Sequence, residues 1–250
     1  MRRMEPGNRT ALPSDEVHIH ILRVGADPGF PVSGDSLSPL SEEEVGHYQD
    51  FEPEEKRLEF LLSRLMIRKL GSFYLGKEPE DLKFYRKEGG KPFFAGTSLQ
   101  FNLSHTQGLI ACSFAWAPVG IDIENGLESN SRQRSLLARR YFSPEEKAFL
   151  LEKGSFEDTS ADFLRIFTMK EAYGKALGKG LCFPLDQFSV PLPPSKKALV
   201  GEFEFFLRDL KPLNACLAHV VRKFKVPVRY KLFTWQEGSF SGKTSSPVCA

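Results

Sequence analysis

The sequence has few of the features that mark secreted, membrane-bound or nucleic-acid-binding proteins. Its four cysteines lie far apart among 250 residues, which disfavours both a disulfide framework and a paired-cysteine metal site. No apolar run approaches the roughly 18 residues that span a membrane, and the N-terminus lacks an apolar signal segment. A formal net charge of +2 is too small for a typical nucleic-acid-binding domain. We therefore expect a cytoplasmic protein with reduced cysteines that binds neither membranes nor nucleic acids.

The residues that are present predict a folded chain with polar ends. Hydrophobic side chains make up 41% of the sequence, which is enough for a substantial core. Residues 1–15 are polar and contain proline and glycine, which predicts a disordered leader. Residues 238–250 are rich in serine and glycine, which predicts a flexible tail.

A short sequence motif occurs twice in the region between these ends. Residues 51–56 (Phe-Glu-Pro-Glu-Glu-Lys) and 142–147 (Phe-Ser-Pro-Glu-Glu-Lys) differ at one position, and each has proline where the first turn of a helix accepts it. We expect two similar sheet-plus-helix lobes, residues 16–118 and 119–237, in an α+β fold. Strand-like stretches lie at 17–22, 101–114, 188–190, 202–206, 215–221 and 228–235.

A predicted helix over residues 163–177 places one carboxylate among lysines. At 3.6 residues per turn, Glu171 and Lys175 lie one turn apart on one face, with Lys170 beside them. Gly178 and Gly180 follow, as is typical of a helix end. This layout suits a metal and phosphates, although an ordinary surface ion pair has the same spacing.

The segment 119–124 alternates apolar and polar side chains. As a strand, it buries Ile121 and Ile123 and places Asp122 and Glu124 together on the other face. Two carboxylates on one surface suit Mg²⁺, which completes its shell with water and substrate phosphate. A half-exposed strand with its polar face in water is the alternative.

Histidines occur on two further predicted strands. His105 follows Ser104 at a strand end beside Gly108, where it can satisfy its nitrogens locally or donate to a nearby phosphate. His18 and His20 share a strand face, but no third ligand is near, so we expect an exposed face rather than a metal pair.

The order and wording of these motifs resemble one known family, the 4′-phosphopantetheinyl transferases of the larger, surfactin-synthetase-activating type. The resemblance covers about residues 54–190 and includes the step Gly90-Lys91-Pro92. One departure is Phe167, where relatives commonly have tryptophan, and we expect this residue to pack the helix. The matching motifs are Phe-Asn-Leu-Ser-His (101–105), Val-Gly-Ile-Asp-Ile-Glu (119–124), Tyr-Phe-Ser-Pro-Glu-Glu (141–146) and Met-Lys-Glu-Ala-Tyr-Gly-Lys-Ala-Leu-Gly-Lys-Gly-Leu (169–181).

The resemblance implies a pseudo-twofold monomer with its active site between the lobes. Such an enzyme is a holo-[acyl-carrier-protein] synthase, which transfers 4′-phosphopantetheine from coenzyme A to a serine of an apo acyl or peptidyl carrier protein. The products are the holo carrier and 3′,5′-ADP. The resemblance implies that Asp122, Glu124 and Glu171 hold Mg²⁺ against the pyrophosphate, and that Glu171 removes the serine proton, directly or through a metal-bound water.

The basic residues are assigned by the same resemblance and by their positions. The catalytic set is Glu171, Asp122 and Lys175, and the expected coenzyme-binding set is Ser104, His105, Lys175, Lys170, Lys91, Arg68, Arg64 and Arg57. The three arginines lie along the edge of an apolar helix face, where ordinary solvation is the alternative. Arginines at 132, 134, 139 and 140 could attract acidic carrier domains or simply be solvated.

Two other functions fit the same residues. One is another Mg²⁺-dependent phosphotransferase or phosphohydrolase that acts on a nucleotide-like substrate. The other is a non-catalytic binder of carrier proteins. The sequence does not specify which carrier protein or pathway would be served.

Overall fold

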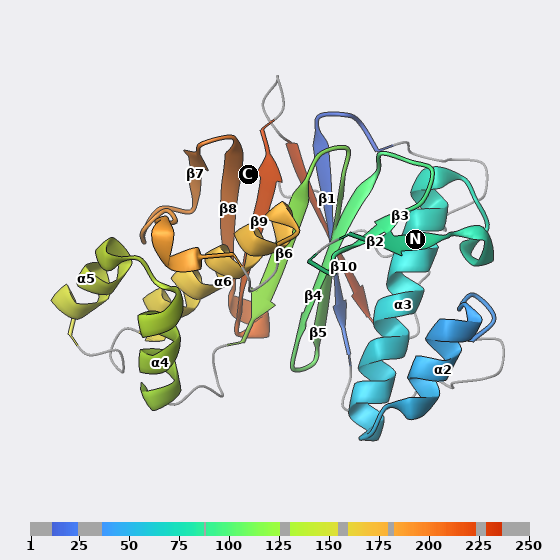
Figure 1. Cartoon of the computed structure of the whole chain (residues 1–250), viewed down its shortest axis with the longest axis horizontal. Helices are drawn as coiled ribbons and strands as arrows, with labels where there is room; N and C mark the ends of the chain where they lie inside the picture. The colour runs from blue at the N-terminus through green and yellow to red at the C-terminus, as the bar shows by residue number, and fades with distance from the viewer. Residues whose placement is uncertain are drawn as a thin grey trace.

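The computed structural model describes residues 12–24, 37–87, 89–125, 131–154, 160–179, 183–223 and 229–236. It shows two four-stranded sheets side by side, each with helices packed on it (Figure 1). This α+β arrangement of two similar lobes confirms the predicted fold class. Among the described residues, none of the helices combines the length and apolar composition that crossing a bilayer requires.

The first sheet has the order β10-β1-β5-β4. The hairpin β4 (Gln100–Thr106) and β5 (Leu109–Ala115) is antiparallel, and β1 (Glu16–Arg23) pairs antiparallel with β5. Strand β10 (Arg229–Gln236) pairs parallel with β1, so the chain returns to the first lobe at its end. The predicted second lobe, 119–237, is therefore wrong at its C-terminal strand.

The second sheet has the order β6-β9-β8-β7, and all its pairs are antiparallel. Its strands are β6 (Val119–Glu124), β7 (Lys197–Val200), β8 (Phe203–Leu210) and β9 (Ala215–Arg222). Helix α6 (Ser160–Leu177) packs across β6 and β9, with buried residues such as Met169 and Ala172 in the core between them. The predicted strand at 188–190 does not form.

The remaining elements complete the two lobes. In the first lobe, α3 (Glu54–Leu75) packs on the sheet and α2 packs on α3. The small strands β2 and β3 form an antiparallel pair. The other bounds are α2 (Glu42–Asp50), η1 (Pro79–Asp81), β2 (Phe84–Arg86), β3 (Pro92–Phe94), α4 (Ser131–Tyr141), α5 (Pro144–Glu152), η3 (Leu185–Gln187) and η4 (Lys211–Leu213).

The internal repeat is visible in the helix caps. Ser41 caps α2 in a capping box with Glu44, and Ser143 caps α5 in the same box with Glu146. The structural counterpart of residues 142–147 is therefore the start of α2. It is not the segment 51–56, although that segment is more similar in sequence. The repeated motif correctly predicted two similar lobes, but it did not predict which residues of the two lobes are equivalent.

The same glutamates then bind the main helix of each lobe. Glu44 accepts from Arg68 of α3 at 2.6 Å, and Glu146 accepts from Lys170 of α6 at 2.8 Å. Each pair joins residues separated by 24 positions. The equivalent positions 41 and 143, 44 and 146, 68 and 170, and the helix-ending glycines 76 and 178 all differ by 102.

The edge strands β4 and β6 form the junction between the lobes. They belong to separate sheets, and side chains rather than a backbone ladder connect them. Alternate residues along β4 each reach the β6 segment: Asn102 accepts from the amide of Ile121 at 2.8 Å, Ser104 donates to Asp122 at 2.7 Å, and Thr106 donates to Asn125 at 2.8 Å. Because alternate residues share a strand face, β4 presents one polar edge to the second lobe.

The first described residues are part of the fold. Leu12 is buried, and its carbonyl oxygen accepts from the Trp116 indole at 2.8 Å. The predicted leader 1–15 is therefore too long at its C-terminal end. Residues 1–11 and the predicted tail 238–250 lie outside the described residues.

Candidate active site

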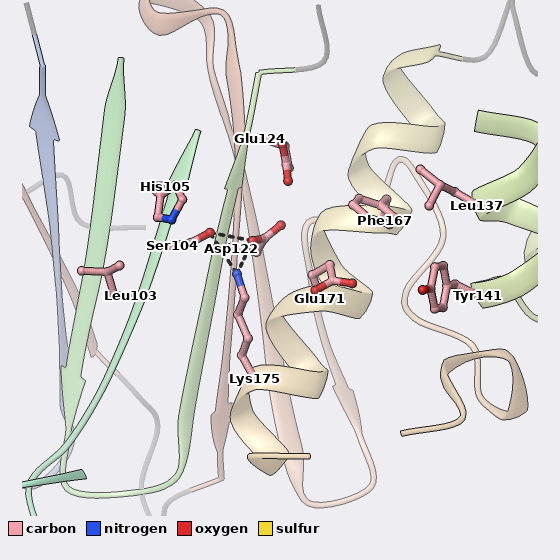
Figure 2. Close-up of a pocket in the computed structure, with 10 residues that line it drawn as sticks. All are labelled: Leu103, Ser104, His105, Asp122, Glu124, Leu137, Tyr141, Phe167, Glu171 and Lys175. Atoms are coloured by element: carbon pink, nitrogen blue, oxygen red, sulfur yellow. Dashed lines mark hydrogen bonds and ion pairs between the residues drawn. The ribbon is translucent and has the colours of Figure 1, made fainter. Parts of the chain in front are cut away.

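A pocket of about 460 Å³ opens where β4, β6, α4 and α6 meet (Figure 2). It lies at the lobe junction, since β4 belongs to the first sheet and β6 to the second. The structure thus brings together residues that are up to 72 positions apart in the sequence, from Leu103 to Lys175. The polar side chains that line the pocket are Ser104, His105, Asp122, Glu124, Glu171 and Lys175.

Asp122 and Lys175 make the central ion pair of the pocket. The Lys175 ammonium lies 2.5 Å from Asp122 Oδ1 and 2.9 Å from the Ser104 hydroxyl (Figure 2). Asp122 is 2% exposed, and its second oxygen, Oδ2, has no hydrogen-bond partner among the described residues. An unsatisfied buried carboxylate oxygen is costly unless a further donor or cation completes it.

Glycine 120 explains how α6 comes so close to β6. A Cβ at Gly120 would lie 1.9 Å from the Ala172 carbonyl oxygen and 2.4 Å from the Ala176 amide nitrogen. Only a residue without a side chain permits this approach. The strand that carries Asp122 and the helix that carries Lys175 are therefore held in contact next to the pocket.

The carboxyl groups of Glu124 and Glu171 share the pocket with Asp122. Burial, followed by the negative charges of Asp122 and Glu171, raises the pKa of Glu124 to about 7. Burial and Asp122 also raise the pKa of Glu171. These carboxyl groups repel one another, so a cation among them would be stabilised.

The predicted metal ligands are close but not assembled. Within the described part of the chain, no three His, Cys, Asp or Glu side chains form a ready-made metal cluster. The unsatisfied Oδ2 of Asp122 and the oxygen-only donor set nevertheless suit a hard cation such as Mg²⁺. The residues therefore fit the ion that the resemblance implied.

An apolar wall stands opposite the charged residues. Leu137 and Tyr141 of α4 and Phe167 of α6 line the pocket (Figure 2). The expectation that Phe167 packs the helix was incomplete, since it stacks on Phe163 and also faces the pocket. The roles of Leu137 and Tyr141 were missed, although their spacing of four residues on a helix predicts a shared face.

Lys170 is not in the pocket, which corrects its predicted contact with coenzyme phosphates. Its side chain is 0% exposed and pairs with Glu146. Its ammonium also donates to the carbonyl oxygens of Leu185 and Phe188. Adjacent residues of a helix point in different directions, so Lys170 points into the core whereas Glu171 faces the pocket.

Arg68 is likewise a core residue, which corrects its predicted phosphate contact. It pairs with Glu44 and donates to the carbonyl oxygens of Pro79 and Leu82. Arg57 donates to the Phe51 carbonyl oxygen. Neither arginine lines the pocket, and Arg64 does not line it either.

Lys91 lies in the lobe junction rather than in the pocket. Its ammonium donates to the Val119 carbonyl oxygen at 2.6 Å, and burial lowers its pKa to about 8. Two residues earlier, Gly89 packs closely against the C-terminal end of α6. A Cβ atom added at Gly89 would lie 2.1 Å from the Gly178 carbonyl oxygen. The bond to Val119 uses one of the three donors of the ammonium group, so the predicted phosphate contact of Lys91 stays a prediction.

The histidine pair on β1 is buried, so the predicted exposed face was wrong. The hydroxyl of Tyr74 lies 2.8 Å from His18 Nδ1 and 2.7 Å from His20 Nε2. His18 Nε2 donates to Glu16 at 2.9 Å. Tyr74 comes from α3, and its hydroxyl could not be anticipated as a partner because it lies 54 positions away.

The described cysteines are free thiols inside the sheets. Cys112 and Cys216 are buried, and burial raises the pKa of Cys216 to about 12 and that of Cys112 still higher. Burial and a raised pKa both disfavour the reactive thiolate form of these two cysteines. Cys182 and Cys249 lie outside the described residues.

The fold and the pocket together define a class of protein. Acidic and basic side chains meet at a junction of two similar lobes, an arrangement suited to transfer of phosphorylated groups. A family model described as the 4′-phosphopantetheinyl transferase superfamily matches residues 118–228. A second model, described as 4′-phosphopantetheinyl transferase, N-terminal, matches residues 34–114.

Curated relatives agree with these models. The chain is 36% identical over 222 residues to the 4′-phosphopantetheinyl transferase HetI of Nostoc sp., with 86% of this chain and 91% of that protein covered. It is 35% identical over 168 residues to the 4′-phosphopantetheinyl transferase Sfp of Bacillus subtilis, with 62% and 72% covered. Identity to the 4′-phosphopantetheinyl transferase gsp of Aneurinibacillus migulanus is 35% over 128 residues, with 51% and 52% covered.

This chain belongs to the 4′-phosphopantetheinyl transferase superfamily. Its predicted membership of the larger type is confirmed, because both lobes match and its relatives include Sfp.

Proposed function

We propose that the pocket transfers 4′-phosphopantetheine from coenzyme A to a serine of an apo carrier protein. The observation that carries the proposal is the Asp122–Lys175 pair, with its unsatisfied carboxylate oxygen, in a pocket shared with Glu124 and Glu171. Charge of both signs at one junction suits a diphosphate that must be bound and then cleaved.

In the reaction, the serine oxygen forms a bond to the β-phosphorus of coenzyme A. The bond from that phosphorus to the bridging oxygen of 3′,5′-ADP breaks, and the electron pair leaves with the nucleotide. Lys175 and His105 lie where they could bind phosphate oxygens and stabilise the charge that develops. Magnesium, held by Asp122, Glu124 and Glu171, would neutralise charge on the diphosphate.

Glu171 is the proposed acceptor of the serine proton. Its carboxyl group lines the pocket beside Asp122 and Lys175, within the site where the serine would lose its proton. The proton passes from the serine hydroxyl to a Glu171 carboxylate oxygen, directly or through a water molecule. Lys170, its neighbour in sequence, is in the core and takes no part in the step.

The apolar wall gives the acceptor a place to approach. Leu137 and Tyr141 belong to α4, whose exposed side also carries Leu136, 58% exposed, and Arg139 and Arg140. An acidic carrier domain with apolar side chains near its serine would complement this helix. We further propose that the enzyme acts as a cytoplasmic monomer.

The experiment is incubation with coenzyme A, magnesium and a panel of apo acyl, aryl and peptidyl carrier proteins. We expect at least one carrier to gain the mass of one phosphopantetheine in intact-protein mass spectrometry, with 3′,5′-ADP released in equal amount. Omission of magnesium should abolish the gain. Release of nucleotide from coenzyme A without any acceptor would instead identify a hydrolase.

A further inference from the structure

Glu59 lies outside the pocket lining but contacts a residue inside it. Glu59 is in the second turn of α3, and its Oε1 lies 2.7 Å from Nδ1 of His105 at the end of β4. Its Oε2 accepts from Lys56 at 3.1 Å. The Glu59 side chain is 19% exposed and that of His105 is 46% exposed, so the pair lies at the pocket mouth.

This contact determines which ring nitrogen can serve a ligand. An ionised carboxylate only accepts hydrogen bonds, so His105 Nδ1 must carry a proton and donate to Glu59. The other nitrogen, Nε2, makes no hydrogen bond or ion pair with any described residue. In a neutral ring that nitrogen is a bare acceptor, which cannot donate to a phosphate; only the imidazolium donates from both nitrogens.

The charges that face His105 come from three elements. Glu59 and Asp122 favour the imidazolium, whereas Lys56 and Lys175 oppose it, and burial is the largest influence. The balance lowers the pKa of His105 below its ordinary value, so the ring is neutral near pH 7.5 without a ligand. An anionic phosphate at Nε2 would reverse that balance, because opposite charges favour the protonated ring.

We propose that Glu59 is a positioning residue for His105: it holds Nδ1 so that Nε2 faces the bound ligand, and it stabilises the imidazolium that forms when a coenzyme A phosphate binds. Binding of coenzyme A is then linked to uptake of a proton by His105. The inference rests on the proposed function, which supplies the phosphate. This role also explains why the Glu59 carboxylate lies so near a site for a phosphate. Glu59 contacts the His105 imidazolium, and it is the imidazolium that contacts the phosphate.

Substitutions separate the two parts of this role. Glu59→Gln keeps an oxygen that can accept from Nδ1 but removes the charge, whereas Glu59→Ala removes both. Glu55→Gln, an exposed acid one turn earlier on α3, is the matched control. Isothermal titration with coenzyme A at pH 7.5, in buffers of different ionisation enthalpy, measures affinity and proton uptake together.

For the unmodified protein and Glu55→Gln, we expect uptake of up to one proton per coenzyme A bound. Glu59→Gln should lose most of this uptake and bind about tenfold more weakly, the equivalent of roughly one pKa unit. Glu59→Ala should bind more weakly still. In a His105→Ala background, Glu59→Gln should have no further effect, because the ring through which it acts is gone.

Unchanged affinity and proton uptake in Glu59→Gln would overturn the positioning role while leaving coenzyme A binding, and so the proposed function, intact. Tighter binding by Glu59→Gln would also overturn it, since Glu59 would then repel the ligand. If the unmodified protein binds no coenzyme A, the proposed function itself fails and the inference fails with it.

Discussion

The two lobes place different chemistry at equivalent positions. With the separation of 102 residues, Asp122 on β6 corresponds to His20 on β1. Asp122 meets Lys175 at an open pocket, whereas His20 meets Tyr74 in a closed cluster. One scaffold thus supports an accessible charged site in one lobe and a sealed hydrogen-bonded network in the other.

The acidic residues are the difference that matters for function. Leu22 and Lys69 occupy the positions that correspond to Glu124 and Glu171, so the first lobe lacks the carboxylates of the second. The feature that the two lobes share is structural. In each lobe, the glutamate of a helix capping box forms an ion pair with a buried arginine or lysine side chain of the main helix. The two lobes therefore have in common the ion pairs that hold the main helix, but not the carboxylates that line the pocket.

The largest expected effect separates Asp122 from His20. We expect Asp122→Asn to lower carrier modification by about 10³-fold, because it removes a charge that organises Lys175 and the bound cation. His20→Gln should lower the free energy of unfolding by about 1–2 kcal/mol by disturbing the Tyr74 network, with near-normal activity. Initial rates and urea unfolding measure both. Comparable losses of activity in the two variants would remove the functional distinction between the lobes.

The next effect tests what the lobes share. Arg68→Met and Lys170→Met should each lower the free energy of unfolding by about 3–5 kcal/mol, because they leave the half-buried Glu44 and the fully buried Glu146, respectively, without a cationic partner. Coenzyme A affinity of the folded fraction should change little. Arg139→Met, on the exposed side of α4, is the control. Loss of affinity without loss of stability in Lys170→Met would restore its predicted role at the phosphates.

A smaller effect concerns the helix–strand contact of the second lobe. Gly120→Ala should lower the free energy of unfolding by about 1–3 kcal/mol, because the new methyl group overlaps the Ala172 carbonyl. The equivalent position in the first lobe is His18, a large residue, so the close approach is specific to the active lobe. Chemical unfolding and transfer rates should both change. A variant as stable and active as the unmodified protein would contradict the close contact.

The smallest effect, counted for each pH unit, is the pH dependence of stability, and it compares buried histidines. His219 on β9 has no hydrogen-bond partner among the described residues, and burial lowers its pKa to about 3. The unfolded chain protonates His219 near pH 6.5 and the folded protein does not, so stability falls as the pH drops below 6.5. The fall should be about 1.4 kcal/mol per pH unit for this group.

His219→Leu should therefore flatten the decline in stability between pH 6.5 and 4, with little loss at pH 7.5. His20→Gln should flatten it as well, since burial lowers the His20 pKa, but at a net loss of stability because the Tyr74 contact goes with it. Urea unfolding across this pH range gives the slopes. Parallel slopes for His219→Leu and the unmodified protein would show that His219 titrates normally when folded.

The sequence was informative about the site because strand and helix periods are local. Alternation placed Asp122 and Glu124 on one face, and helical spacing placed Glu171 and Lys175 on another. The same spacing could not tell that Lys170 turns inward, because its partner Glu146 lies 24 positions away. The capping pattern of serine and glutamate around Ser143 was the one available signal.

Long-range pairing was beyond local patterns for the same reason. Strand β10 was expected in the second lobe, yet it pairs with β1 across more than 200 positions. Nothing in its own alternation specifies that partner. The Glu59–His105 contact joins α3 to β4 in a similar way, and no local pattern around either residue indicates it.

The most direct test of the account is time-resolved mass spectrometry of an apo carrier protein with coenzyme A and magnesium. We expect the unmodified enzyme and His20→Gln to add one phosphopantetheine at similar rates, and Asp122→Asn to add almost none while remaining folded. A folded Asp122→Asn variant that modifies the carrier at the unmodified rate would show that the pocket between the lobes is not the active site.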